Sequence, residues 1–253
     1  MVDNSLYFAV MSGLESRFQY ISAHPKEKVM QSEGFYEYLR ALAGGSESLV
    51  RYEDFPEIID VGKDFHDTFR SLNEVSKVTG KEVYGLISYR ENRRAIYLPT
   101  TFAEGESEVI SGEVMSKEWE RIRKLGMVGK IGDLHSHPPI EQRIFFSSSD
   151  LFSLVRVGRD RHLVSGVVQG DSYMFALASL ETASHLVPSI MNRDGFNQYW
   201  LVNNLKKNGI GGNGELDSGL LADGVQMNLD IAERHKLGIY EGKLNFPMRR
   251  LRS

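Results

Sequence analysis

The segment GDLHSHPPIEQRIFFSSSD, residues 132–150, determines how we interpret the middle of the chain. Its first part continues an apolar strand pattern, two prolines interrupt that pattern, and SSSD is typical of the start of a helix. Side chains two apart in a strand point to the same side, so His135 and His137 should project together. Asp150 should lie in the first turn of the following helix. The segment therefore predicts two imidazoles and one carboxylate that could share a metal ion.

Each half of this pattern also has an ordinary structural explanation. The sequence Ser147-x-x-Asp150 is a common helix N-terminal cap, and a His-x-His sequence is often structural or surface-exposed. In combination, two imidazoles and one carboxylate form a three-ligand set, which in catalytic zinc sites leaves the fourth position to water. The combination favours a metal site, while the cap interpretation of Asp150 stays open.

The composition limits the kind of protein this is. With 253 residues, 41% hydrophobic and 25% charged, the chain suits one domain of moderate size with extensions, or two small domains. It has no cysteine, so any metal must be held by histidine and carboxylate. A net charge of −4 argues against nucleic acid as the main partner. No apolar run is long enough to span a membrane, and the first residues lack a signal-peptide pattern, so we expect a cytoplasmic protein.

Strand and helix patterns alternate through the central region. We expect strands at 57–61, 82–89, 94–102, 129–137, 162–169 and 173–179, and helices at 64–78, 112–127 and 147–157. Residues 1–54 are predicted to form a helical N-terminal extension. Residues 196–253 are predicted to form a helical C-terminal extension with a glycine-rich hinge at 209–219. The sequence thus predicts an α/β domain over residues 55–195 between two helical flanks.

A catalytic zinc site also needs a general base outside the ligand set. Glu82 opens the predicted strand 82–89, directly after the helix 64–78 and Gly80. A glutamate at a strand start is by default a solvated residue. The context distinguishes this one, because E-x-x-G-L stands at a helix-to-strand junction about fifty residues before H-S-H-P. We therefore take Glu82 as the candidate base.

These residues together resemble the JAMM (MPN+) zinc metalloprotease family. The matching positions are Glu82-x-x-Gly85-Leu86, Gly132 followed by His135-Ser136-His137-Pro138, and Ser147-x-x-Asp150. The similarity covers roughly residues 56–180. It implies an α/β fold of the cytidine deaminase-like type, in which a curved mixed β-sheet is flanked by helices.

The resemblance also implies a role for each matching residue. His135, His137 and Asp150 would bind Zn²⁺. Glu82 would take a proton from the attacking water and pass it to the leaving amine. Ser147 would donate a hydrogen bond to the tetrahedral oxyanion, an interaction worth roughly 3 kcal/mol when such donors are removed.

The sequence departs from the family pattern in two places. The family usually has seven residues between the second histidine and the serine, and this chain has nine. Strict spacing would put Phe145 at the serine position and Ser148 at the aspartate position. A two-residue insertion in a surface loop costs little free energy, so we predict that Ser147 and Asp150 are the functional pair. Asp133 stands where the family often has an aromatic residue, and it is either a hydrogen-bond partner of an imidazole or an exposed polar residue.

The function implied by the resemblance is zinc-dependent hydrolysis of peptide or isopeptide bonds, because the family typically removes ubiquitin or ubiquitin-like modifiers from lysine. The expected partner is then a protein or peptide conjugate. Two other functions stay open, a non-catalytic MPN-type scaffold subunit and a zinc hydrolase of small-molecule conjugates, because substrate choice lies outside the metal core. The two extensions could serve a homo-oligomer or a larger complex.

Overall fold

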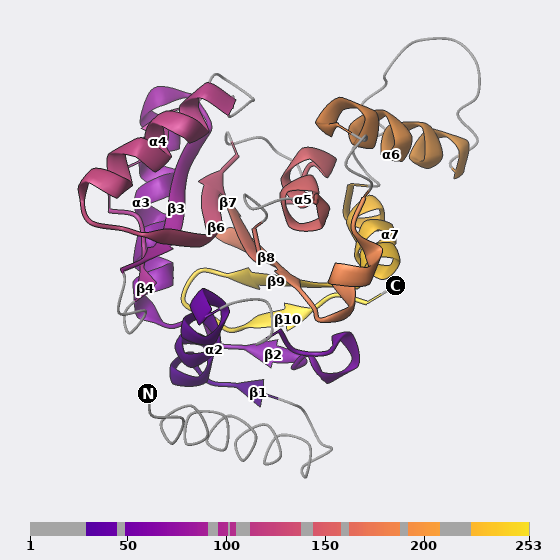
Figure 1. Ribbon diagram of the computed structural model, residues 1–253, viewed down its shortest axis with the longest axis horizontal. Helices are drawn as coiled ribbons and strands as arrows, with labels where there is room; N and C mark the ends of the chain where they lie inside the picture. The colour runs from indigo at the N-terminus through magenta and orange to yellow at the C-terminus, as the bar shows by residue number, and fades with distance from the viewer. Residues whose placement is uncertain are drawn as a thin grey trace, which may run out of the picture.

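The computed structural model describes residues 29–44, 49–90, 96–100, 102–104, 112–137, 144–157, 162–187, 192–207 and 224–252 (Figure 1). Its helices are α2 (Ser32–Gly44), η2 (Tyr52–Asp54), α3 (Lys63–Thr79), α4 (Gly112–Lys124), α5 (Ser148–Val155), η3 (Glu181–His185), α6 (Arg193–Lys207) and α7 (Gly224–His235). Its strands are β1 (Val29–Met30), β2 (Ile58–Ile59), β3 (Val83–Tyr89), β4 (Ile96–Tyr97), β5 (Ala103–Glu104), β6 (Gly129–Ser136), β7 (Val164–Gln169), β8 (Ser172–Ala178), β9 (Leu237–Lys243) and β10 (Met248–Arg250). Within these ranges no helix is both long and apolar enough to cross a membrane.

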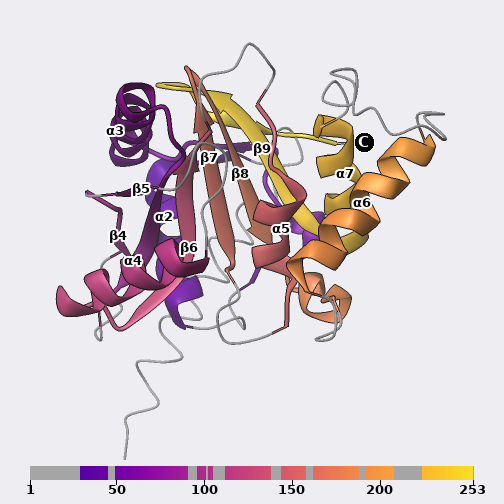
Figure 2. The same cartoon turned by 90° about the horizontal axis from the view of Figure 1, so that it is seen from above.

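The described strands form one open sheet of mixed direction. Their order is β1-β2-β10-β9-β8-β7-β6-β3-β4, and β5 also pairs with β3. The pairs β1–β2 and β6–β7 are parallel, and the other pairs are antiparallel. Helices flank both faces of this sheet (Figure 2). The prediction of an α/β fold with a mixed sheet between helices is therefore confirmed at this level.

The face of the sheet under α2 and α3 is an apolar core. Phe35 of α2 and Phe69 of α3 both contact Phe175 of β8, with ring centroids 5.8 and 5.5 Å apart. Gly166 of β7 lies among these side chains, where a Cβ would be 2.6 Å from Leu134 Cδ2 and 3.1 Å from the Phe69 ring. The three phenylalanines and Leu134 are fully buried. Leu134 of β6 therefore points into this core.

The opposite face of the sheet carries polar side chains. Because side chains alternate along a strand, Asp133 and His135 of β6 point away from the core that holds Leu134. Tyr84 of β3 is the cross-strand partner of His135, and it packs with Ile122 of α4 in a second, smaller apolar cluster. Helix α5 contacts β7 and β8 beside it. Figure 2 shows α3 on one side of the sheet and α4 and α5 on the other.

Gly132 is required by the close pairing of two central strands. It is the partner of Val164 where β6 and β7 run parallel. A Cβ at position 132 would lie 1.9 Å from the Val164 carbonyl oxygen, which no side chain can tolerate. The glycine that precedes the first histidine therefore has a packing reason of its own, independent of any catalytic role.

The prediction of a helical C-terminal extension is wrong for residues 237–250, where the structure has strands β9 and β10. Two glycines in β9 hide its strand pattern, since glycine weakens a strand and gives no apolar signal. Both glycines lie against neighbouring atoms. A Cβ at Gly238 would be 3.0 Å from the Phe55 ring, and one at Gly242 would be 2.8 Å from the Tyr173 ring. Strand β9 is therefore determined by tertiary packing, and the local sequence does not predict it.

The N-terminal flank also contributes to the sheet. Helix α2 is preceded by β1, which pairs with β2, so this flank is not purely helical in its described part. Residues 1–28 and the predicted hinge at 209–219 lie outside the described residues. The division of the chain at residues 54 and 195 stays a prediction, although strands from both flanks belong to the central sheet.

Candidate metal centre

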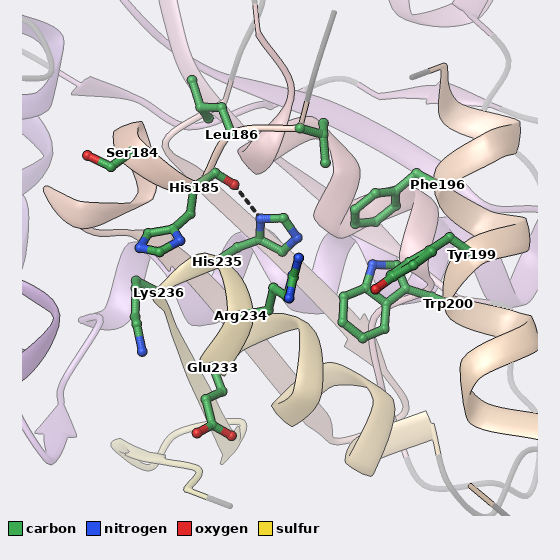
Figure 3. Close-up of a pocket in the computed structure, with 11 residues that line it drawn as sticks. Ser184, His185, Leu186, Phe196, Tyr199, Trp200, Glu233, Arg234, His235 and Lys236 are labelled. Atoms are coloured by element: carbon green, nitrogen blue, oxygen red, sulfur yellow. Dashed lines mark hydrogen bonds between the residues drawn. The ribbon is translucent and has the colours of Figure 1, made fainter. Parts of the chain in front are cut away.

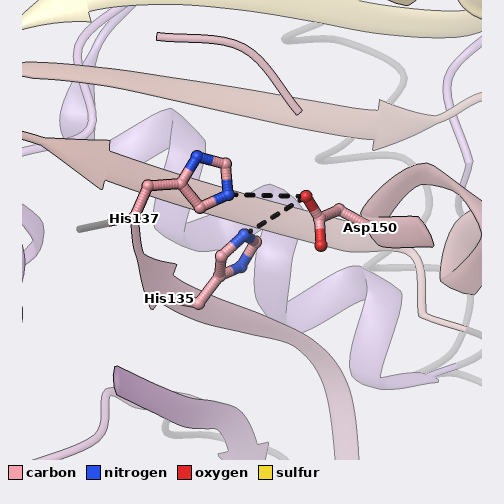
Figure 4. Close-up of side chains that lie close together, drawn as sticks. All are labelled: His135, His137 and Asp150. Carbon is pink, nitrogen blue, oxygen red and sulfur yellow. Dashed lines mark ion pairs between the residues drawn. The ribbon is translucent and has the colours of Figure 1, made fainter. Parts of the chain in front are cut away.

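The two histidines lie at the C-terminal end of β6. His135 is the second-to-last residue of β6. His137 follows the strand, and its N–H donates to the Val168 carbonyl of β7 at 3.0 Å. The centroids of the two imidazole rings are 5.3 Å apart. The alternation of strand side chains therefore places the two rings side by side, as the sequence predicts (Figure 4).

Helix α5 begins with a reciprocal cap. Ser147 Oγ accepts the Asp150 N–H at 3.2 Å, and Asp150 Oδ2 accepts the Ser147 N–H at 2.8 Å. The cap interpretation of Ser-x-x-Asp is thus confirmed as a capping box. The same hydrogen bonds hold the Asp150 carboxylate in the first turn of α5, where it faces the histidines. Capping and proximity to the imidazoles are therefore not alternatives.

The three predicted ligands converge. Asp150 Oδ2 lies 3.6 Å from His135 Nε2 and 3.6 Å from His137 Nε2, and the potential ligand atoms are all within 4.8 Å of one another. Two ligands bound at about 2.0–2.1 Å in a tetrahedral zinc site lie about 3.3 Å apart, so little adjustment is needed. The side chains are 4%, 15% and 18% exposed for His135, His137 and Asp150. This group could hold a metal ion.

The observed geometry also answers the question of loop spacing. The carboxylate that reaches the histidines is that of Asp150, thirteen positions after His137 and three after the cap Ser147. Ser148, which strict spacing would put in the ligand position, instead donates a hydrogen bond to Asn197 of α6 at 2.8 Å. The longer loop is therefore compatible with an assembled three-residue group.

Asp133 is buried and bonded to two imidazoles. Its Oδ2 lies 3.0 Å from His135 Nδ1, and its Oδ1 lies 2.8 Å from Nδ1 of His162. Of the two interpretations of Asp133, the imidazole partner is the one observed. An ionised carboxylate accepts the Nδ1–H of His135 and so leaves the lone pair on Nε2, which is the arrangement that metal-binding histidines usually have. His135 Nε2 is buried with no hydrogen-bond partner among the described residues, as expected for an atom meant to bind a cation.

The charges of this cluster are strongly coupled. Burial favours a higher pKa for Asp133, but hydrogen bonds from His135 and His162 outweigh it and lower the pKa to about 2. Burial likewise opposes ionisation of Asp150, but the two imidazoles hold its pKa well below the usual range. Burial lowers the pKa of His135, whereas the carboxylates of Asp150 and Asp133 raise it well above the usual range. The two carboxylates thus favour a positive charge at this position, which a proton or a metal ion can supply.

The group opens into a cavity of about 380 Å³ between α4, α5 and the sheet. His135, Asp150, Glu82 and Ser147 all contribute to its wall, so the predicted base and the predicted oxyanion donor face the same space as two of the three predicted metal ligands. Glu82 lies immediately before β3 and is half-buried. The structure brings all of these predicted residues to one place.

Sequence reasoning missed other polar residues of this cavity. Arg156, Arg193, His162 and Tyr84 line it, and no short motif contains them. Tyr84 could have been found from register alone, because it is two residues after Glu82 and pairs with the histidine strand. Arg156 directly follows α5 and Arg193 begins α6, and the relative position of these two helices is not encoded locally.

A larger cavity of about 610 Å³ lies away from the metal group, between η3, α6 and α7 (Figure 3). Phe196, Tyr199 and Trp200 of α6 form its aromatic wall, and His235 Nδ1 lies 2.6 Å from the His185 carbonyl oxygen. Burial lowers the pKa of His235 and so favours the neutral form of its ring. Among the described residues, His135, His137 and Asp150 are the one group with metal-ligand geometry, so this second cavity has none.

Comparison of the sequence with protein-family models and with curated proteins gave no match.

Proposed function

We propose that this protein is a zinc-dependent hydrolase of peptide or isopeptide bonds with a JAMM-like arrangement of residues. One observation carries the proposal. The Nε2 atoms of His135 and His137 lie 3.6 Å from Asp150 Oδ2, and His135 and Asp150 line the same cavity as Glu82 and Ser147.

The donor set favours zinc. Two imidazoles and one carboxylate suit zinc, whereas magnesium and calcium prefer all-oxygen ligands. Three protein ligands leave an open position, as in catalytic rather than structural sites. When bound, zinc would polarise a substrate carbonyl and make water more acidic, with a pKa of about 7. The buried Nε2 of His135 and the Asp133 carboxylate behind its Nδ1 both fit such a cation.

The residues of the chain would divide the remaining chemistry. Glu82 would take a proton from the attacking water and deliver it to the leaving amine nitrogen. The oxygen of Ser147 accepts the Asp150 N–H, so its own O–H proton is the donor that would bind the developing oxyanion. Asp133 would keep the Nδ1–H of His135 in place and thereby fix the orientation of its ring.

The proposed substrate is a protein or peptide conjugate. The resemblance to the JAMM family supports an isopeptide bond between a ubiquitin-like modifier and a lysine. Cytoplasmic action stays a prediction. MPN-type relatives that lack the metal-binding residues serve as scaffold subunits. In this chain His135, His137 and Asp150 lie close enough to share a metal ion, and this favours an enzyme over a scaffold.

Metal content tests the proposal without knowledge of the substrate. We expect about one zinc per chain in the wild type by elemental analysis, from the three-ligand set, and little zinc in Asp150→Ala. Glu82→Gln should keep the zinc but lose hydrolysis of a fluorogenic lysine-isopeptide substrate, because the carboxamide cannot accept the proton. Absence of zinc from the wild type, even after it is added back at neutral pH, would refute the hydrolase and favour the scaffold. Retained turnover in Glu82→Gln would refute its role as the base.

A further inference from the structure

Asn228 of α7 binds the backbone that leads into α5. Its Oδ1 accepts the Phe146 N–H at 2.8 Å, and its Nδ2 donates to the Phe146 carbonyl at 2.7 Å. The Asn228 side chain is fully buried, and only one orientation of its amide satisfies both bonds. Asn228 therefore fixes both polar groups of one residue, as a neighbouring strand would.

Phe146 stands immediately before the cap of α5. Ser147 is that cap, and its reciprocal hydrogen bonds orient the Asp150 carboxylate. The Phe146 ring is itself fully buried, and its centroid lies 6.3 Å from that of His135. A displacement of Phe146 would therefore move Asp150 relative to the histidines of β6.

The start of α5 is held by α6 and α7 at further points. Asn197 of α6 accepts from Ser148 Oγ at 2.8 Å and donates to Ser149 Oγ at 2.6 Å. Gly224, the first residue of α7, lies against Phe145, and a Cβ there would be 2.6 Å from the ring. The loop that precedes α5 thus ends on a surface that the C-terminal helices supply.

We infer that Asn228 is a positioning residue of the metal centre. By holding Phe146, it sets the distance between the Asp150 carboxylate and the imidazoles of His135 and His137. The sheet fixes the histidines independently, so the place where α5 begins decides whether the three ligands meet. This inference rests on the proposed metal site. It means that α7 helps to position a ligand of that site, although Asn228 is 82 residues from Phe146 in sequence.

The chain contains a matched control for this contact. Asn73 of α3 donates to the Gly170 carbonyl at 2.8 Å and accepts the Gly170 N–H at 3.2 Å. This is the same pair of bonds between one buried amide and one backbone residue. Gly170 lies in the turn between β7 and β8, and neither residue lines the cavity of the metal group. Loss of Asn73 should therefore affect stability without affecting the metal.

The experiment compares metal binding by wild type, Asn228→Ala and Asn73→Ala in the full-length protein. Zinc affinity is measured by competition with a chromophoric chelator, and Co²⁺ is added in place of zinc so that its visible spectrum reports the coordination geometry. Asn228→Ala should bind zinc about 10- to 100-fold more weakly, the loss typical for partners that orient metal ligands, and its Co²⁺ spectrum should change. Asn73→Ala should lower the melting temperature but keep the wild-type affinity and spectrum.

A folded Asn228→Ala variant with the wild-type affinity and spectrum would overturn the inference and leave the proposed function standing. A wild type that binds neither Zn²⁺ nor Co²⁺ would overturn the proposed metal site itself. Should Asn228→Ala not fold, Asn228→Gln is informative, because it keeps a neutral amide but its extra methylene displaces that amide from both polar groups of Phe146. Its zinc affinity should be lower than that of the wild type, and a wild-type affinity would again refute the positioning role.

Discussion

Asp133 and Leu134 are adjacent on β6, yet they belong to two different environments. Leu134 faces the aromatic core under α3, where it lies with the buried rings of Phe69 and Phe175 around Gly166. Asp133 faces the cavity under α5, where carboxylates and imidazoles pair with one another. The comparison indicates that the apolar packing around Leu134 contributes to the free energy of folding, whereas the position of Asp133 holds groups whose burial costs free energy unless they are paired.

The largest expected effect is on the apolar face. Leu134→Ala should lower the free energy of unfolding by about 2–5 kcal/mol, because it removes a fully buried side chain and leaves a cavity. Chemical denaturation measures this change. The folded variant should still bind zinc with the wild-type affinity, and a large loss of zinc affinity would show that the two faces are not independent.

Ser147 caps α5 and also lines the cavity on the polar face, so its substitution should affect both stability and activity. Ser147→Ala should reduce isopeptide hydrolysis about 10²- to 10³-fold through loss of the oxyanion donor. It should also cost about 1 kcal/mol of stability through loss of the cap. Steady-state kinetics and thermal unfolding measure the two effects separately, with zinc content as the control. A stability loss without any loss of turnover would restrict Ser147 to capping.

Asp133→Asn is the counterpart of the leucine change on the polar face. Zinc affinity should fall about 10- to 100-fold, because a neutral amide orients and polarises the His135 ring less well than a carboxylate. Competition titration with a chelator measures it. The metal-free variant should also be less stable than the wild type, because the substitution removes the charge that the two buried imidazoles of His135 and His162 pair with. An unchanged zinc affinity would contradict the role given to Asp133.

The smallest expected effect concerns a histidine outside the polar face. Burial lowers the pKa of His66 on α3, whereas the carboxylates raise that of His135. Below about pH 6.5 this histidine therefore binds a proton in the unfolded chain more readily than in the folded protein. The contribution of His66 to stability falls as the pH decreases. In metal-free protein, unfolding at pH 7.5 and pH 5.5 should show a weaker pH dependence for His66→Gln than for wild type. An equal dependence would mean that His66 is not held neutral.

Local sequence was sufficient for the central part of this fold. The apolar spacing of α3 and the short apolar runs of β6 through β8 predict those elements closely, because α3 buries one face and the three strands are buried along most of their length. The His-x-His spacing and the cap pattern also predict which side chains meet, since each depends on a single strand or a single helix turn.

The rest depends on contacts between distant segments. Strand β9 was missed because Gly238 and Gly242 are there to accommodate neighbouring rings, and a neighbour's ring is not visible in local sequence. Asp133 could not be assigned because its second partner, His162, comes from the adjacent strand connection. The contact of Asn228 with Phe146 has no local sequence pattern, because the sequence around an asparagine does not show which distant backbone group its side chain will bind.

The sheet order has a consequence for the sequence of events in folding. Strand β10 lies between β2 and β9, so the ribbon of β1 and β2 joins the rest of the sheet only through the last strand described. During synthesis the ribosome releases His135 and Asp150 well before α7 and β10, and long-range pairings of this kind form slowly. A nascent chain would thus contain His135, His137 and Asp150 for some time before Asn228 can bind Phe146, so the proposed metal site would be completed only after α7 has been synthesised.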